Sequence, residues 1–384
     1  MRRGIAHVLV FAVGGFFWAG KHFSPRPSEA KTSAHVAYDP TEIEKSVRFL
    51  ESRALSDPQG ATGLAMLASA YLRRQSELGD PDDLLRAEAS ARRSLSVRSH
   101  NNPIGLWALT KALMGRHAFA QAHAVATQLG DGALEAECDL ELGNYDRARK
   151  RLAEAAALRP TDPIIRVLQA RVWELVGKVQ LAEDAYKSAL ALTDINFETS
   201  APSRAWFHSR LAAFLASQGR LADAKQEYEA ALDAFPNDRR ATLGLAQLAA
   251  EQGDKTEARR LAETIALPEA AMLLYTLGDK SQWERITSEA SGRHVHGRAL
   301  ALFYADAGRN LEEAVRLMRS DWSARKDIHT ADALAWTLYK AGEQDEAKIY
   351  ARLALDTGTC DRSILEHAKQ ILSETNDETK LYPH

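Results

Sequence analysis

The sequence predicts an all-α fold, an α-solenoid of stacked helical hairpins, and three observations support this prediction. Glycines recur with similar neighbours, and 34 residues separate Gly143 from Gly177 as well as Gly219 from Gly253. Self-similarity at such a period is typical of repeat proteins. Alanine-rich segments with helical spacing of apolar residues dominate, and no alternating strand pattern is sustained beyond a few residues. The recurring glycines are Gly143, Gly177, Gly219, Gly253, Gly308 and Gly342.

Small residues follow these glycines at fixed offsets. In four of the segments an alanine lies five residues after the glycine, and a second alanine lies seven residues after the first. We expect the glycine to end the first helix of a hairpin in a left-handed cap, and the alanines to mark where the second helix approaches its partner closely. The first alanines are Ala148, Ala182, Ala224 and Ala347, and the second are Ala155, Ala189, Ala231 and Ala354.

The N-terminus has the features of a targeting segment. Arg2 and Arg3 precede an uncharged apolar run from residue 4 to residue 20, which fits the basic and apolar regions of a secretory signal. The run is also close to the ~17–25 residues that a membrane-spanning helix needs. A cleaved signal peptide over residues 1–20 and an uncleaved anchor therefore both stay open. Residues 21–39 are rich in proline and serine and are expected to form a flexible linker.

An amphipathic stripe of apolar residues lies at each end of the array. The first predicts an N-terminal capping helix over residues 40–58, and the second predicts a C-terminal capping helix and tail over residues 358–384. The solenoid is expected to cover residues 60–357, with room for about eight to nine repeats, some of them degenerate. Because repeats bury their faces on one another, this number is sufficient for a stable array.

One segment departs from the repeat pattern. Near Gly278, Trp283 stands at the position of the first alanine. If no hairpin forms there, the array bends or breaks near residues 266–296, and its two halves move independently. In a regular array each repeat contacts only its neighbours, so we do not expect Cys138 to pair with Cys360, about six repeats away.

Composition and motifs argue against several classes of function. The formal net charge is −3 at pH 7, without the basic footprint that nucleic-acid binding requires. The sequence has no GxSxG, HExxH, GxGxxG or phosphate-loop motif. We therefore expect neither enzymatic activity nor a cofactor. The histidine pairs His117 with His123 and His294 with His296 lack converging partners for a metal.

The segments around the recurring glycines resemble the tetratricopeptide repeat, a helix-turn-helix unit with a matching period. A small residue seven positions before the glycine contributes to the resemblance. It occurs as Ala136, Ala170, Ala212, Ala246 and Ala335. The last repeat, from Thr330 to Gly342, is similar to the closing repeat of many bacterial envelope tetratricopeptide proteins. The resemblance implies an exported bacterial protein, periplasmic, extracellular or anchored to the membrane by its N-terminus.

The resemblance also implies where a partner binds. In this family the first helix of each hairpin lines a concave groove that holds an extended peptide or a helix of a partner. Helical spacing places a mixed polar and aromatic set on that side, which suits protein recognition better than a small apolar ligand. The candidate groove residues are Arg171, Glu174, Trp206, Gln247, Glu251, Asp332, Trp336, Tyr339 and Lys340.

The expected function is therefore a non-catalytic scaffold that binds a protein or peptide partner through its concave face, exported or tethered at the cell envelope. Two alternatives stay open. The chain is an enzyme-associated or catalytic subunit acting on envelope substrates, or it is a structural protein whose arrays stack end to end. The oligomeric state is not indicated by the sequence.

Overall fold

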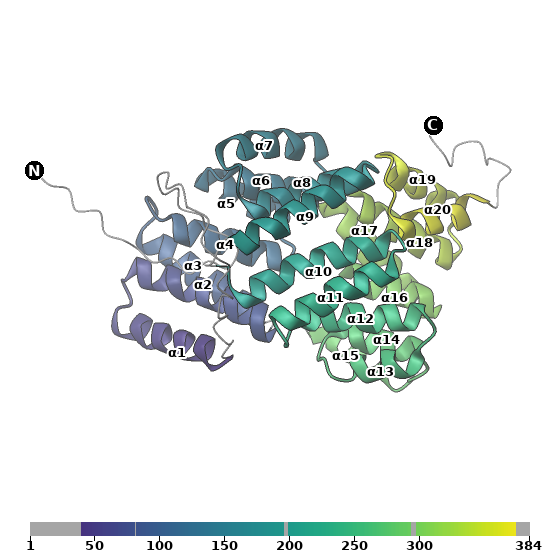
Figure 1. Cartoon of the computed structure of the whole chain (residues 1–384), viewed down its shortest axis with the longest axis horizontal. Coiled ribbons are helices and arrows are strands. Elements are labelled where there is room, and N and C mark those ends of the chain that lie inside the picture. Colours follow the sequence, from purple (N-terminus) through teal and green to yellow (C-terminus); the bar gives the residue numbers. More distant parts are fainter. Residues whose placement is uncertain (1–39, 81, 196–198, 293–296, 374–384) are drawn as a thin grey trace, which may run out of the picture. The chain divides into compact units, whose positions relative to one another are not determined.

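The computed structural model describes residues 40–80, 82–195, 199–292 and 297–373. This part of the chain is all-α and contains 20 helices in paired hairpins (Figure 1), which confirms the predicted fold class. The expected signal peptide or anchor over residues 1–20 and the expected linker over residues 21–39 lie outside the described residues. So does the end of the C-terminal tail.

The chain divides into two compact units, residues 1–108 and residues 109–384. Unit 1 contains α1 (Pro40–Ser56), α2 (Ala61–Leu78) and α3 (Asp82–Val97), and the boundary falls within α4 (Pro103–Gly115). The helices α2 and α3 form a hairpin, and α1 packs on α2. Ile43 and Val47 of α1, within the predicted capping helix, are fully buried, so the apolar face of α1 is the one that packs.

The described part of unit 2 is a succession of hairpins between α5 (Phe119–Leu129) and α20 (Arg362–Ser373). The first helices are α6 (Gly132–Glu141), α8 (Pro163–Leu175), α10 (Ala201–Ser217), α12 (Arg239–Glu251), α14 (Pro268–Thr276), α16 (Gly297–Ala307) and α18 (Ile328–Ala341). The second helices are α7 (Tyr145–Leu158), α9 (Val179–Ile195), α11 (Leu221–Ala234), α13 (Lys255–Ala262), α15 (Gln282–Gly292), α17 (Leu311–Ala324) and α19 (Gln344–Leu355).

The turns between first and second helices follow the predicted pattern. All six recurring glycines have positive φ, for example 80° at Gly143 and 87° at Gly342. This left-handed conformation costs other residues energy, which explains why glycine recurs there. The alanines five residues after the glycine in four hairpins have no exposed surface, which confirms the close approach of the paired helices.

Several first helices begin with an aspartate that the sequence analysis did not single out. The Oδ1 atom of Asp162 accepts a hydrogen bond from the backbone nitrogen of Ile164 at 2.9 Å. Asp131, Asp238 and Asp327 cap α6, α12 and α18 in the same way. Each cap satisfies backbone donors that lack a partner in the first helical turn, and so fixes where the helix starts.

The segment near Gly278 does form a hairpin, because α14 and α15 pack together. The bulk of Trp283 is accommodated by an aromatic cluster instead of a close helix approach. Its ring lies 5.6 Å from the ring of Tyr275 and 5.5 Å from that of Phe303. The boundary between the two compact units therefore lies elsewhere, within α4.

The end of unit 2 returns to its first hairpins, so the expectation that each repeat contacts only its neighbours is wrong here. The backbone nitrogen of Ile328 donates to the hydroxyl of Tyr145 at 2.8 Å. The backbone nitrogen of Lys326 donates to the carbonyl of Leu142 at 3.3 Å. Curvature accumulates from repeat to repeat in a solenoid, and here it brings α18 back to the turn between α6 and α7.

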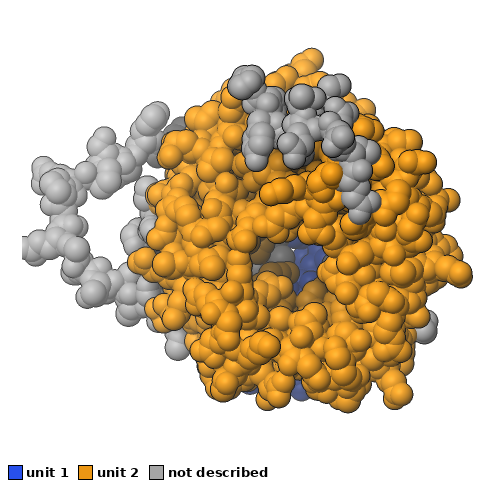
Figure 2. All heavy atoms as spheres, turned by 90° about the vertical axis from the view of Figure 1, so that its right-hand side faces the viewer, with its two compact units in different colours: residues 1–108 blue, residues 109–384 orange. Residues whose placement is uncertain are grey.

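The contact between the two ends of unit 2 has an apolar core. Leu140 and Leu175 belong to the same buried cluster as Ile328 and Ile364. Figure 2 shows a hollow at the centre of one face of unit 2, with atoms of unit 2 around it. Unit 2 is thus a curved array that closes on itself, rather than an open rod.

Candidate binding surface of the helical array

The first helices form the concave layer of unit 2. Several successive first helices contact one another, as α6 does with α8, α10 with α12, and α16 with α18, whereas successive second helices in the described residues share few or no contacts. In a curved array the more closely spaced layer lies on the concave side. The first helices therefore lie on the concave side of unit 2.

Equivalent positions on three consecutive first helices define the surface that we call the inner face. Arg171 of α8, Ala213 of α10 and Gln247 of α12 each lie six residues before the turn glycine of their hairpin. Trp206 of α10 and Arg240 of α12 each lie thirteen residues before it. Ala213, Gln247 and Arg240 are exposed, and Trp206 and Arg171 are half-buried.

Arg171 is held by a carboxylate that also reaches the other end of unit 2. Its Nη2 atom donates to Oε1 of Glu141 at 2.6 Å, and Oε2 of Glu141 lies 3.7 Å from Nη1 of Arg325. Burial on its own raises the pKa of Glu141, but Arg171, Arg325 and Arg298 outweigh it and hold this pKa below its ordinary value. Glu141 therefore stays ionised and links the inner face to the segment before α18.

Glu174 takes part in a second network, through a tyrosine of the neighbouring helix. The hydroxyl of Tyr186 donates to Oε2 of Glu174 at 2.5 Å. The Nη2 atom of Arg210 in turn donates to the Tyr186 hydroxyl at 3.2 Å. Burial raises the pKa of Tyr186 above its ordinary value, so the phenol is neutral and serves as a donor. The predicted groove residue Glu174 thus acts mainly within the chain.

Three predicted groove residues are accessible on α10 and α12. Gln247 is exposed, and Glu251 is exposed while its Oε1 atom accepts from Nη1 of Arg362 at 2.7 Å. The ring of Trp206 packs edge-on against Phe207, with ring centres 4.9 Å apart. These side chains lie on α10 and α12, which contact one another.

Two predicted groove residues on α18 lie beneath α20. Trp336 is only 5% exposed, its Nε1 atom donates to Oδ1 of Asp306 at 2.7 Å, and its ring stacks on His367 at 4.1 Å. Asp332 is buried and pairs with Nδ1 of the same histidine at 3.0 Å. After the last hairpin, α20 takes the place of a further first helix and covers this side of α18. These two side chains join α18 to α20.

Tyr339 and Lys340 lie at the edge of the same cluster. The ring of Tyr339 stacks against Trp336 at 5.6 Å, and the ammonium of Lys340 lies 4.8 Å from the centre of the Trp336 ring. Tyr339 is half-buried and Lys340 is exposed. The nine candidates therefore fall into separate groups, one on α8, α10 and α12 and one between α18 and α20.

Sequence reasoning missed three residues of the inner face, Arg210, Ala213 and Arg240. Ala213 and Arg240 share the offsets of Arg171 and Trp206 from the turn glycine, so the repeat register contained the signal. Ala213 was not predicted because its methyl side chain carries no charge and no hydrogen-bonding group. It matters because it leaves space between the longer side chains of α8 and α12.

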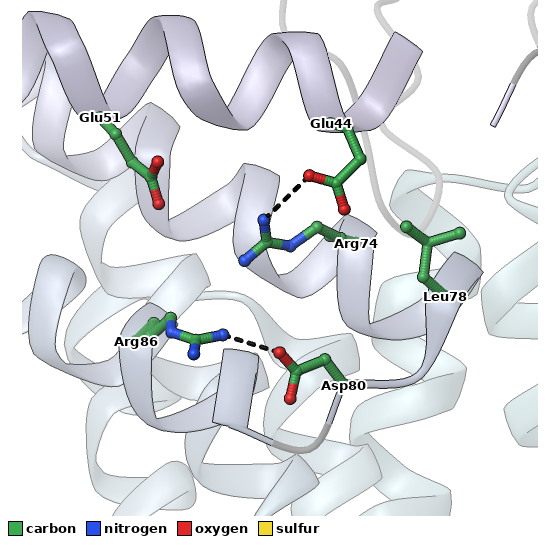
Figure 3. A pocket seen from close by; sticks show the side chains of 6 residues that line it. All are labelled: Glu44, Glu51, Arg74, Leu78, Asp80 and Arg86. Carbon is green, nitrogen blue, oxygen red and sulfur yellow. Dashed lines mark hydrogen bonds and ion pairs between the residues drawn. The ribbon is translucent and has the colours of Figure 1, made fainter. Parts of the chain in front are cut away.

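Unit 1 has a pocket of about 390 Å³ with charged walls. Figure 3 shows Arg74 directed at Glu44, 3.3 Å apart, and Arg86 directed at Asp80, 2.8 Å apart. Arg74 also pairs with Asp83 at 2.7 Å. Glu44, Arg74, Asp80 and Arg86 thus pair within the pocket walls, and Glu51 accepts a hydrogen bond from the hydroxyl of Tyr71 at 2.7 Å. The lining residues are Glu44, Glu51, Arg74, Leu78, Asp80 and Arg86.

The described residues contain no group of histidine, cysteine and carboxylate side chains placed to bind a metal ion. Among the described helices, none combines the length and the apolar character needed to cross a membrane. Cys138 and Cys360 are both free, and burial raises the pKa of the Cys138 thiol to about 12, which keeps it protonated.

Three solved structures are similar to this array. A chain of the APC/C hetero-tetramer Cut9–Hcn1 matches with 15% identity and a TM-score of 0.42, over 86% of this chain and 59% of that chain. The human IFIT1 dimer with m7Gppp-AAAA matches with 16% identity and a TM-score of 0.48, over 83% and 77%. Pseudomonas aeruginosa PilF matches with 18% identity and a TM-score of 0.27, over 67% and 83%.

Similarities at this level carry no information on function, and this chain spans less than two thirds of the Cut9–Hcn1 chain. A search of curated proteins gives no match. A family model described as "Tetratricopeptide repeat" matches residues 134–194 and 215–272. These segments contain the hairpins α6 to α9 and α11 to α13, in which the turn glycines and buried alanines lie as that repeat requires. The chain therefore contains tetratricopeptide repeats over these residues, within a tetratricopeptide-like helical array.

Proposed function

We propose that the chain is a non-catalytic scaffold that binds a protein or peptide partner through the inner face of unit 2. Tetratricopeptide repeat proteins typically bind protein partners. The main support for the proposal is a set of exposed and half-buried side chains on the first helices α8, α10 and α12. It combines Arg171 and Glu174 of α8, Trp206 of α10, and Gln247 and Glu251 of α12.

The geometry favours an extended partner. Equivalent residues recur at the same offset on α8, α10 and α12, so the surface continues from one repeat to the next. A segment lying across the three helices contacts each repeat in turn, which is how solenoids use a concave surface. Aromatic and arginine side chains are enriched among residues that dominate binding energy in protein interfaces, and Trp206 and Arg171 provide both types.

The test compares binding by the full-length chain with two variants that add the same bulk at different places. In Ala213→Trp the indole fills the exposed position at the centre of the inner face. In Ala191→Trp the same group stands at an exposed position on the second helix α9. Each chain is immobilised in mild detergent and used for affinity capture from an extract of the source cells.

A partner that the parent chain and Ala191→Trp retain, and that Ala213→Trp loses, would support binding at the inner face. Circular dichroism and thermal unfolding confirm that both variants keep the fold. Recovery of the same proteins by all three chains would contradict the proposal. The alternatives to examine would then be end-to-end assembly, by light scattering against concentration, and turnover of envelope substrates.

The proposed location is the cell envelope, with the chain exported or tethered by its N-terminus. Arg2, Arg3 and the apolar run over residues 4–20 support it. N-terminal sequencing of the protein from cells separates the two forms. A start after residue 20 indicates a cleaved signal, an intact N-terminus in the membrane fraction indicates an anchor, and an intact N-terminus in the soluble cytoplasm contradicts export.

A further inference from the structure

The inner face has a charge imbalance that indicates the chemistry of its partner. Arg210 of α10 makes a hydrogen bond to the Tyr186 hydroxyl and has no carboxylate within ion-pairing distance among the described residues. Arg239 and Arg240 at the start of α12 likewise have no ion pair there. Three guanidinium groups on two adjacent first helices therefore lack a direct anionic partner within the described structure.

Glu174 does not compensate Arg210 directly. Its Oε2 atom accepts the Tyr186 hydroxyl at 2.5 Å, and this phenol stands between the carboxylate and the guanidinium. Arg171, the next cation along the inner face, already has its own carboxylate, Glu141, at 2.6 Å. A guanidinium has five N–H donors, and Arg210 uses one of them in this network.

The surroundings of Arg210 and Arg239 are poorly solvated, and those of Arg239 are also electropositive, whereas Tyr186 and Glu174 raise the pKa of Arg210. Arg210 and Arg239 are half-buried. Burial lowers the pKa of Arg239, and the adjacent Arg240 lowers it further. Removing a cation from water without an ion-pair partner is unfavourable. A carboxylate supplied by a partner would form an ion pair with the arginine and so offset the free-energy cost of its desolvation.

The space beside Arg210 suits an extended chain. Trp206 lies one helical turn before Arg210 on α10, so the two side chains share a face. Phe207 supports the indole from the side. Ala213 follows Arg210 on the same helix and is exposed, which leaves room for a backbone. Arg240 occupies on α12 the position that Trp206 occupies on α10.

The geometry points to an acidic, extended peptide as the partner of the inner face. One acidic side chain pairs with Arg210 beside Trp206, and a second pairs with Arg240 on the next repeat. Packed helices lie about 8–10 Å apart and an extended chain advances about 3.3 Å per residue, so the two acidic residues are about three positions apart. This inference rests on the proposed function, because it names the partner class of the same surface.

The experiment is a selection of random dodecapeptides displayed on phage, with the full-length chain and four variants as targets. Arg210→Gln removes the charge at the proposed anchor. Arg149→Gln removes a charge from α7 whose side chain is 65% exposed, and is the matched control. Ala213→Trp blocks the inner face as a whole. Arg210→Lys is a second variant of the anchor, which keeps the charge and loses the planar fork.

The inference predicts that the parent chain and Arg149→Gln enrich peptides with Asp or Glu at two positions about three residues apart. A synthetic peptide from this pool should bind Arg210→Gln at least about tenfold more weakly, as expected when a hydrogen bond to a charged group is lost. Replacing its glutamates by glutamine should weaken binding to the parent by a similar factor and change binding to Arg210→Gln little. Arg210→Lys should bind with intermediate affinity.

Enrichment of peptides without an acidic bias, or equal affinity of an acidic peptide for the parent and for Arg210→Gln, would overturn the inference and leave the binding scaffold intact. If the parent chain enriches no peptide that Ala213→Trp fails to enrich, the proposed function is contradicted. The inference of an acidic peptide partner then fails with it. If Arg210→Gln does not fold, the affinities of the glutamate and glutamine peptides are compared on the parent and on Arg210→Lys. Equal affinities of the two peptides for the parent would then overturn the inference.

Discussion

The backbone nitrogen of Ile328 donates a hydrogen bond to the hydroxyl of Tyr145 at 2.8 Å, across 183 residues of sequence. Tyr145 opens α7 and Ile328 opens α18. Ile328 also lies in a buried cluster with Leu140 of α6. A solenoid whose repeats met only their neighbours would keep these residues apart. These contacts therefore close unit 2 and hold α18 against α6 and α7.

Replacement of a turn glycine tests the closure. Gly143 and Gly253 both have positive φ, 80° and 85°. A Cβ atom on Gly143 would overlap the carbonyl of Lys326, whereas one on Gly253 meets nothing within 4 Å. We expect Gly253→Ala to lower the free energy of unfolding by about 1 kcal/mol and Gly143→Ala by about 2–4 kcal/mol. Urea titration measures both, and equal losses would argue against the contact.

The closure is expected to depend on apolar packing rather than on its exposed ion pair. Ile364 is 1% exposed in the cluster that joins α20 to α8. Ile364→Ala should lower the free energy of unfolding by about 2–5 kcal/mol. Arg362 pairs with Glu251 at 2.7 Å, but both side chains are largely in solvent, so Arg362→Ala should cause no measurable loss. Thermal denaturation of both variants checks this, and the reverse order would contradict it.

Glu141 should contribute a pH-dependent part of the stability. Its pKa is held below the ordinary value in the folded chain, so its contribution is present above the unfolded pKa of about 4.3 and is lost as the pH falls through the lower folded value. At neutral pH, Glu141→Gln should lower the free energy of unfolding by about 1–3 kcal/mol.

The control for Glu141 is Glu229→Gln, because Glu229 pairs only loosely with Lys225 at 3.8 Å on the surface. Urea titration at neutral pH and in acid provides the comparison. The difference between the parent and Glu141→Gln should shrink in acid, while Glu229→Gln should match the parent throughout. A difference that persists or grows as Glu141 becomes protonated would contradict the role assigned to its charge.

The two tryptophans predicted to face the groove should behave differently. Trp336 is buried between α18 and α20 and donates to Asp306, so Trp336→Ala should lower the free energy of unfolding by about 3–5 kcal/mol. Trp206 is half-buried on the inner face, so Trp206→Ala should cost about 1 kcal/mol or less and weaken partner binding. Chemical denaturation and a binding titration give both readouts. A stable Trp336→Ala chain would refute the buried assignment.

The hairpins could be predicted from the sequence because their causes are local. Gly143 and Gly342 were expected at left-handed caps and have positive φ, and Ala148 and Ala224 were expected at close helix contacts and are fully buried. Each of these roles depends on residues within one hairpin, so a recurring spacing is enough to indicate it.

The closure could not be predicted in the same way. A repeat pattern encodes how neighbours stack, while the contact of Ile328 with Tyr145 depends on curvature summed over several hairpins. The same limit applies to Trp336, which has the same register as Gln247 but lies under α20. Whether a side chain at this repeat position is exposed depends on which helix packs against it. The repeat spacing alone does not give that information.

The most direct test of binding at the inner face is a hydrogen-exchange map of the full-length chain, alone and with its captured partner. Binding at the inner face should slow amide exchange in α8, α10 and α12, with little change in the second helices α7, α9 and α11. Ala213→Trp should abolish the effect and Ala191→Trp should preserve it. Protection confined to the second helices, or protection that survives in Ala213→Trp, would contradict binding at the inner face.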